Sequence, residues 1–163
     1  MKTNYFLNKI LFTIILGLLF LPINAEENKV LDKDLNKNNE LNVYTGMFDW
    51  SDHGKRSNLV GFQHQNEDLN RDSFLGNISP VTGAMITGDS ATYVYTGVQA
   101  QYKIGKINLT PSFTPGLYGA GKGKDLGHIV EFKSEVQFSL DLASDAEIGF
   151  SYNHISNASL GDK

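Results

Sequence analysis

Cysteine is absent from this chain of 163 residues, and several kinds of functional site are excluded with it. Disulfide frameworks, cysteine-ligated zinc, iron–sulfur clusters and thiol nucleophiles all require that residue. An excess of positive charge is also lacking, because 14 Lys and Arg stand against 18 Asp and Glu, for a net charge of −4. This balance argues against a nucleic-acid partner, since nucleic-acid-binding proteins usually present a basic face.

Long hydrophobic runs are scarce, and the one that stands out lies near the N-terminus. Residues 10–21 (ILFTIILGLLFL) follow Lys2 and Lys9, and Ala25 precedes an acidic pair. A positive start, a short apolar stretch and a small residue at the end are typical of a secretory signal peptide, which we predict over residues 1–25. An uncleaved anchor helix is the alternative, although a membrane span needs about 20 apolar residues.

The rest of the chain divides at residue 40. Residues 26–39 have three apolar side chains in fourteen, which predicts a polar N-terminal tail. From residue 40 onward the hydrophobic pattern has period two, which is typical of β-strands. Pro111 and Pro115 predict an edge or a bulge in their strand, because proline cannot donate to a β-ladder. Strands are predicted over residues 41–48, 59–67, 77–87, 93–104, 107–117, 128–142 and 146–153.

The length of these strands points to a membrane barrel. Many have about ten residues or more, whereas strands of soluble proteins usually have about five or six. Their polar faces carry Glu, Lys and Gln, which suit the interior of a small barrel whose apolar faces meet lipid. We therefore expect an all-β fold, with residues 40–163 forming a small antiparallel outer-membrane β-barrel of the eight-stranded type. Seven strands cannot close an even-numbered barrel, so the eighth is expected beyond Lys163. A secreted soluble barrel or sandwich is the alternative.

The lengths of the connections between the predicted strands indicate which end of the barrel faces the outside of the cell. Outer-membrane barrels have short periplasmic turns and long external loops. Residues 48–57 and 119–127 form long connections, which we expect outside, while residues 103–106 and 143–146 form short turns. Two connections disagree with this scheme: the one at residues 68–76 is long where a short turn is expected, and the one at residues 88–91 is short where a long loop is expected.

His154 and Ser156 lie two residues apart near the end of the last predicted strand. On a strand both point to the same side, with Cα atoms about 6.6 Å apart. They continue an apolar face, where polar groups are costly unless they meet headgroups or serve a function. A histidine can take the proton of a serine hydroxyl and so make it a nucleophile. Taken alone, however, a His-x-Ser pair is a common chance pattern, and an ordinary strand end is the better explanation of it.

The stretch YNHISNASLGDK, in residues 152–163, resembles the lipid A 3-O-deacylase (PagL) family, also described as acyloxyacyl hydrolase-like. That family is similar in having a His-x-Ser-Asn motif near the C-terminus of a small eight-stranded barrel. The resemblance implies His154 as general base, Ser156 as nucleophile and Asn157 as a contributor to the oxyanion site. Strict alternation would point the Asn157 side chain inward, so this role requires a bend or its backbone N–H. The resemblance also implies a Glu on the last strand, whereas Asp162 is the one carboxylate that follows Ser156 here.

Two functions are consistent with the sequence. The first is an outer-membrane serine esterase that removes an ester-linked acyl chain from lipid A of lipopolysaccharide. The second is a non-catalytic small outer-membrane barrel with a structural, adhesive or binding role. In both cases the signal peptide exports the chain to the outer membrane, membrane lipid surrounds it, and nucleic acid is not a partner. The oligomeric state is left open, a homodimer included.

Cofactors and metal ions are not expected. His53, His64 and His128 share no metal-ligand spacing. Residues 119–123 (GAGKG) are not followed by the Ser or Thr and the helix of a phosphate-binding loop. The lysines of this region, Lys122 and Lys124, could meet lipopolysaccharide phosphates, but a solvated loop is the simpler interpretation.

Overall fold

The computed structural model describes residues 39–51, 54, 56–66, 69–73, 76–143 and 146–161. The predicted signal peptide lies outside the described residues, and so does the predicted tail except for Asn39. His53 and Asp162 also lie outside them. In this described part of the chain, no helix is long and apolar enough to cross a membrane. Its strands are β1 (Asn39–Phe48), β2 (Ser57–Asn66), β3 (Arg71–Ser73), β4 (Gly76–Thr87), β5 (Thr92–Ala100), β6 (Tyr102–Ile104), β7 (Ile107–Gly119), β8 (Val130–Ala143) and β9 (Ala146–Ser156).

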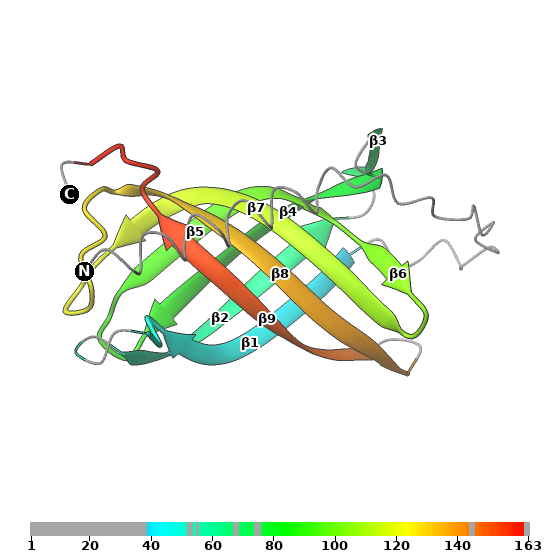
Figure 1. Ribbon diagram of the computed structural model, residues 1–163, viewed down its shortest axis with the longest axis horizontal. Coiled ribbons are helices and arrows are strands. Elements are labelled where there is room, and N and C mark those ends of the chain that lie inside the picture. The colour runs from blue at the N-terminus through cyan, green and yellow to red at the C-terminus, as the bar shows by residue number, and fades with distance from the viewer. Residues whose placement is uncertain are drawn as a thin grey trace. The chain divides into compact units, whose positions relative to one another are not determined.

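All of these strands belong to one antiparallel sheet. The long strands follow one another in the order β1-β2-β4-β5-β7-β8-β9, while β3 pairs with β4 and β6 pairs with β7. The sheet is therefore an up-and-down meander that curls into a half-barrel (Figure 1). This arrangement confirms the predicted all-β, antiparallel fold of the small-barrel type, and each of the seven predicted strands corresponds to a long strand of the sheet.

The connection at residues 68–76 is shorter than the sequence indicated. β3 pairs with the beginning of β4, with Arg71 opposite Ile78 and Ser73 opposite Gly76. Only residues 74–75 separate the two strands, so this segment prolongs a hairpin and belongs with the short connections of that end. At the other end, the connection at residues 88–91 stays tight, because the N–H of Thr87 donates to Ala91 O at 2.8 Å.

The prolines mark neither of the two features expected from the sequence, since β7 is not an edge strand and its register against β5 and β6 shows no bulge. β7 is an interior strand, and its ladder with β8 runs without a gap from Ile107 to Leu117. Its ladder with β5 and β6 is interrupted twice, once beside Pro115 and once beside Pro111. The two residues share one parity, so their missing N–H groups fall on the same side of the strand. The prolines are thus accommodated as two local gaps in a single ladder.

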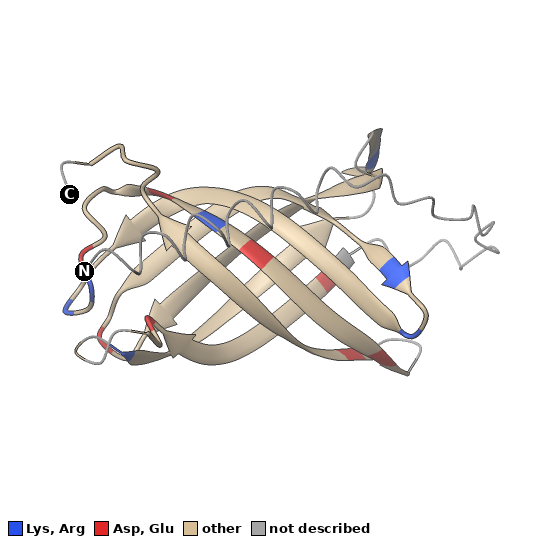
Figure 2. Cartoon of the chain, in the orientation of Figure 1, with Lys and Arg blue, Asp and Glu red and all other residues tan. Residues whose placement is uncertain are grey.

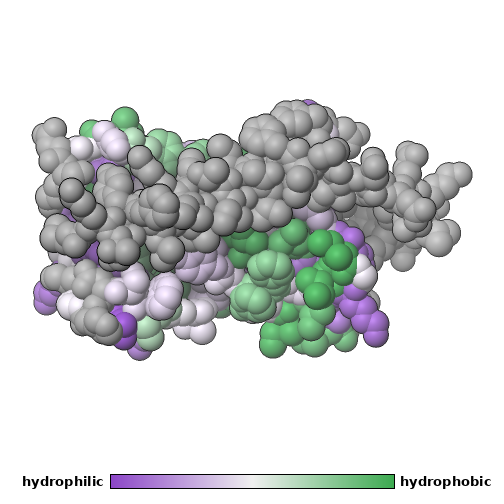
Figure 3. All heavy atoms as spheres, viewed as in Figure 1, coloured by the Kyte–Doolittle hydropathy of each residue, from purple (hydrophilic) through white to green (hydrophobic). Residues whose placement is uncertain are grey.

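The two faces of the curled sheet differ in chemistry. Its inner face carries buried polar side chains, among them Gln63, Gln65, Gln99, Asn108, Thr110, Thr114, Glu131, Lys133 and Glu135. Its outer face carries exposed apolar side chains, among them Leu41, Val43, Val60, Phe62, Val94, Phe113, Leu117, Phe138, Leu140, Ile148 and Phe150. Hydrophobic residues gather over part of the face seen in Figure 3, while Figure 2 shows charged residues mainly at the two ends of the sheet and along β8.

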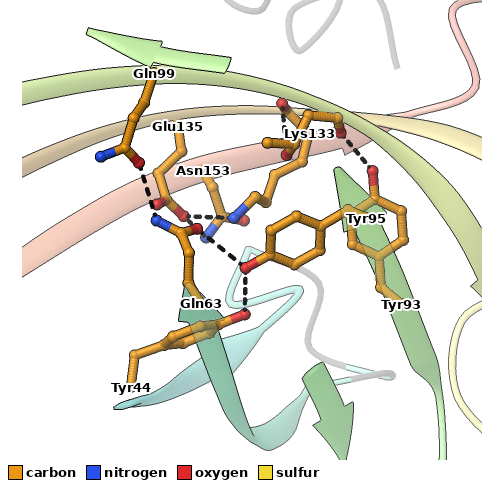
Figure 4. A network of polar contacts seen from close by, with 9 residues as sticks. Tyr44, Gln63, Tyr93, Tyr95, Gln99, Lys133, Glu135 and Asn153 are labelled. Atoms are coloured by element: carbon orange, nitrogen blue, oxygen red, sulfur yellow. Dashed lines mark hydrogen bonds and ion pairs between the residues drawn. The ribbon is translucent and has the colours of Figure 1, made fainter. Parts of the chain in front are cut away.

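A network of polar contacts links the inner face of β8 to strands across the half-barrel (Figure 4). Lys133 Nζ lies 3.2 Å from Glu135 Oε2 and 4.1 Å from the centre of the Tyr95 ring. Tyr95 Oη donates to Gln63 Oε1 at 3.1 Å and lies 3.1 Å from Tyr44 Oη. Because buried polar groups must be satisfied within the protein, these contacts fix which face of each strand points inward.

An apolar cluster fills the inner face at the end where β1, β4, β7 and β9 finish. Its buried members are Phe48, Met85, Ala91, Tyr93, Tyr95 and Tyr118. The rings of Phe48 and Tyr118 stack with centroids 6.1 Å apart, so the first long strand meets β7 across the interior. We call this set the end cluster, because it supports the part of β9 that carries the candidate site.

Candidate active site

His154 and Ser156 occupy the last outward positions of β9. β9 pairs with β8 so that Ser134 lies opposite His154 and Phe132 lies opposite Ser156. Ile155, between them, points inward and packs against the end cluster. Asn153 also points inward, since its Nδ2 donates to Glu135 Oε2 at 3.3 Å. The alternation therefore places the His154 and Ser156 side chains together on the outer face, His154 exposed and Ser156 half-buried.

Asn157 lies in a turn directly after β9. Its Nδ2 donates to Leu126 O at 3.0 Å, and its Oδ1 accepts the N–H of Ser159 at 2.9 Å. Ala158 and Ser159 have positive φ angles of 51° and 67°, so the chain bends sharply here. The bend thus follows Asn157, and the amide ties the end of β9 to the connection between β7 and β8.

Several contacts hold the connections at this end. The Tyr118 hydroxyl donates to Lys124 O at 2.6 Å, and Lys124 Nζ lies 2.8 Å from Asp49 Oδ2. A Cβ at Gly161 would come within 2.6 Å of Gly127 O, so the segment after β9 lies close against the connection between β7 and β8. Of the two lysines considered from sequence, Lys124 is thus held in an ion pair, while Lys122 is exposed.

The immediate surroundings of the pair are mostly apolar. Phe132 stacks on Phe113 with ring centroids 5.9 Å apart, so an aromatic surface lies beside Ser156. The outward positions of the described residues of β8 and β9 include no carboxylate. No hydrogen bond joins His154 to Ser156 within the described structure, and such contacts are often long until a substrate is bound. The arrangement places an imidazole and a hydroxyl on the same, mostly apolar face of β9.

The other histidines and acidic residues form no comparable site. Within the residues that the structure describes, no group of three or more potential ligands could hold a metal ion. His128 accepts the N–H of Val130 at its Nδ1, 3.0 Å away, and so caps the start of β8. His64 is exposed on the outer face of β2.

Sequence reasoning did not identify Ser134, Phe132 and Phe113 as neighbours of the pair. Their alternation was visible, but the register that brings them opposite or next to His154 and Ser156 depends on pairing between strands. A one-residue slip of β9 would have placed the pair on the inner face.

Comparison with known proteins gives one positive finding. Residues 40–163 match the family model described as lipid A 3-O-deacylase (PagL). No curated protein and no solved structure matches the chain. The matched segment includes all of the described strands from residue 40 onward and the three site residues His154, Ser156 and Asn157.

Proposed function

Because the chain belongs to the lipid A 3-O-deacylase (PagL) family, we propose that it is an outer-membrane serine esterase that removes an ester-linked acyl chain from lipid A. The family is one of outer-membrane enzymes that act on lipid A, and membership supports an ester hydrolase. The observation that carries the finer proposal is the placement of His154 and Ser156 on the apolar outer face of the sheet.

The outer face supports a membrane location for this reaction. Its long strands carry exposed Val, Leu, Ile and Phe side chains, and polar residues fill the inner face. In the proposal, the signal peptide (1–25) exports the chain, and the polar tail (26–39) precedes the barrel domain (40–163). The end bearing the connections at residues 49–56 and 120–129 faces outward, as in barrels with long external loops. The pair then lies beside the acyl esters of lipid A in the outer leaflet.

The proposed reaction has two acyl-transfer steps. Ser156 Oγ attacks the ester carbonyl carbon while His154 takes the hydroxyl proton, and His154 then gives this proton to the departing alkoxide. Water attacks the acyl-Ser156 ester, His154 takes a proton from it, and the fatty acid leaves as Ser156 recovers its proton. Asn157 stabilises the oxyanion through its backbone N–H or through the amide hydrogen that Leu126 O does not use. The third member of the triad is not assigned.

Mass spectrometry of lipid A tests this proposal. Expressed in a host with intact lipid A, the protein should yield lipid A that is lighter by one hydroxyacyl chain. Ser156→Ala should abolish the change, and His154→Ala should slow it by about 10²- to 10⁴-fold, because general acid–base catalysis contributes about that much. Ser151→Ala, on the opposite face of the same strand, should retain activity.

Two outcomes would contradict the proposal. If folded Ser156→Ala protein still trims lipid A, Ser156 is not the nucleophile. If the unaltered protein leaves the mass of lipid A unchanged, the non-catalytic barrel becomes the better explanation.

A further inference from the structure

The segment after β9 packs against the connection between β7 and β8 so closely that no side chain fits between them. A Cβ at Gly161 would lie 2.6 Å from Gly127 O and 2.9 Å from Asn157 Nδ2. Heavy atoms of folded proteins essentially never lie that close to a Cβ. The backbone of Gly161 does not have a positive φ angle, so space alone excludes a side chain at this position.

Asn157 is held at three of its atoms within this turn. Its Nδ2 donates to Leu126 O at 3.0 Å, and its Oδ1 accepts the N–H of Ser159 at 2.9 Å. Its backbone oxygen accepts the N–H of Leu160, also at 2.9 Å. Gly161 then closes the turn against Nδ2. The position of Asn157 therefore depends on how closely the turn packs against the connection.

The connection that receives the turn is itself anchored. The side chain of Leu126 packs against the end cluster. The N–H of Gly127 donates to Asp125 Oδ1 at 2.9 Å, and the Tyr118 hydroxyl donates to Lys124 O at 2.6 Å. Since Tyr118 belongs to the end cluster, the buried interior fixes the carbonyl groups on which the turn rests.

We infer that Gly161 is a positioning residue for the oxyanion site: its missing side chain lets Asn157 pack closely enough to keep its donor beside Ser156. This inference rests on the proposed esterase function. It holds for the backbone N–H and for the amide hydrogen alike, because both belong to Asn157. An oxyanion donor must lie about 2.7–3.1 Å from the forming oxyanion, and misplacement by about 1 Å can cost roughly 100-fold in rate. A methyl group at position 161 would force the turn away from a backbone carbonyl, which cannot move aside as a flexible side chain can.

The test is Gly161→Ala, with kcat and KM for lipid A measured on the purified protein in detergent. The variant should lower kcat about 10- to 100-fold and leave KM within about 2-fold, because an oxyanion donor acts in the transition state. Labelling of Ser156 by a fluorophosphonate should slow in parallel, since its phosphoryl oxygen uses the same donor. Gly46→Ala is the control and should change neither rate, because the nearest heavy atom to its Cβ would be Leu59 Cδ1, at 4.0 Å.

A double-mutant cycle with Asn157→Ala separates positioning from a merely structural effect. Asn157→Ala already removes the tie to Leu126 O, so Gly161→Ala should add less than about 2-fold in that background, because residues acting through one contact are not additive. Tyr118→Phe keeps the inference testable if Gly161→Ala does not fold. It loosens the same connection without adding an atom and should lower kcat about 2- to 10-fold, as expected for one lost hydrogen bond.

The outcomes separate this inference from the proposed function. Additive losses in the cycle, or an unchanged kcat in folded Gly161→Ala, would overturn the positioning role and leave the esterase intact. An unchanged kcat in Tyr118→Phe would overturn it where Gly161→Ala does not fold. If the unaltered protein neither deacylates lipid A nor reacts with the probe at Ser156, the esterase proposal fails, and the positioning role fails with it.

Discussion

At the scale of single residues, Lys133 best explains why one particular face of the sheet points inward. Its side chain is 2% exposed, and it lies between the Glu135 carboxylate and the Tyr95 ring. The sequence predicted the polar face of β8 correctly, because Glu131, Lys133 and Glu135 alternate with apolar residues. It could not predict that Tyr95, 38 positions earlier in the chain, would cover the ammonium group.

Removal of the Lys133 ammonium group should destabilise the protein strongly. Lys133→Met leaves the Glu135 carboxylate buried with the Asn153 amide as its remaining hydrogen-bond donor in the described structure, and breaking a buried pair costs about 3–5 kcal/mol. Urea unfolding of the protein in lipid vesicles, with gel mobility as the readout, measures the change in the free energy of unfolding. The control is Lys103→Met, since Lys103 also pairs with a carboxylate, that of Asp141, but is 63% exposed at its side chain. A loss in the control as large as in Lys133→Met would contradict the role of burial.

At the scale of elements, β8 and β9 determine where the candidate site lies. The period-two pattern was enough to predict both strands and to place His154 and Ser156 on one side. The position of Asn157 was not predictable in the same way, because its turn depends on Leu126 from another connection. The effect of the β7 prolines was not predictable for a related reason. Only the pairing partners of β7 show that both missing N–H groups interrupt the same ladder, the one with β5 and β6.

Lysine substitutions along β8 test its assigned faces. Val136→Lys places a charge on the outer face and should impair assembly in membranes by roughly 2–4 kcal/mol if the position lies near the bilayer midplane. Gln137→Lys places the same charge on the inner face and should be tolerated far better. Folding into vesicles at equal lipid concentrations gives the comparison. Equal defects in the two variants would show that the faces are assigned wrongly.

At the scale of the whole chain, the described sheet combines an apolar exterior with a polar interior. A soluble sandwich or barrel would bury Val and Phe faces, whereas here Val43, Phe62 and Phe150 are between 54% and 76% exposed. The sequence anticipated this inversion from strand length and from the polar residues that alternate with apolar ones. What it left open was which of those polar residues would pair: Lys133 pairs with Glu135 and Tyr95 donates to Gln63, whereas the buried Glu131 carboxylate has no hydrogen-bond partner within the described structure.

Fractionation tests the membrane location that follows from this inversion. The protein should remain with the outer-membrane pellet after a carbonate wash and should require detergent for extraction, because its exposed apolar surface would otherwise meet water. A periplasmic soluble barrel expressed in the same host provides the control for incomplete lysis. Recovery of the protein in the carbonate supernatant would contradict a lipid-facing outer surface.

The outward position of His154 and Ser156 also bears on how such an enzyme would meet its substrate. A catalytic pair on a convex, lipid-facing wall samples molecules that diffuse laterally past it, so encounters take place in two dimensions. The quantity that governs turnover is then the mole fraction of lipid A in the surrounding leaflet, and the volume of the cell suspension is irrelevant. Changes in leaflet composition would therefore lower or raise the turnover rate of such an enzyme without any regulatory ligand.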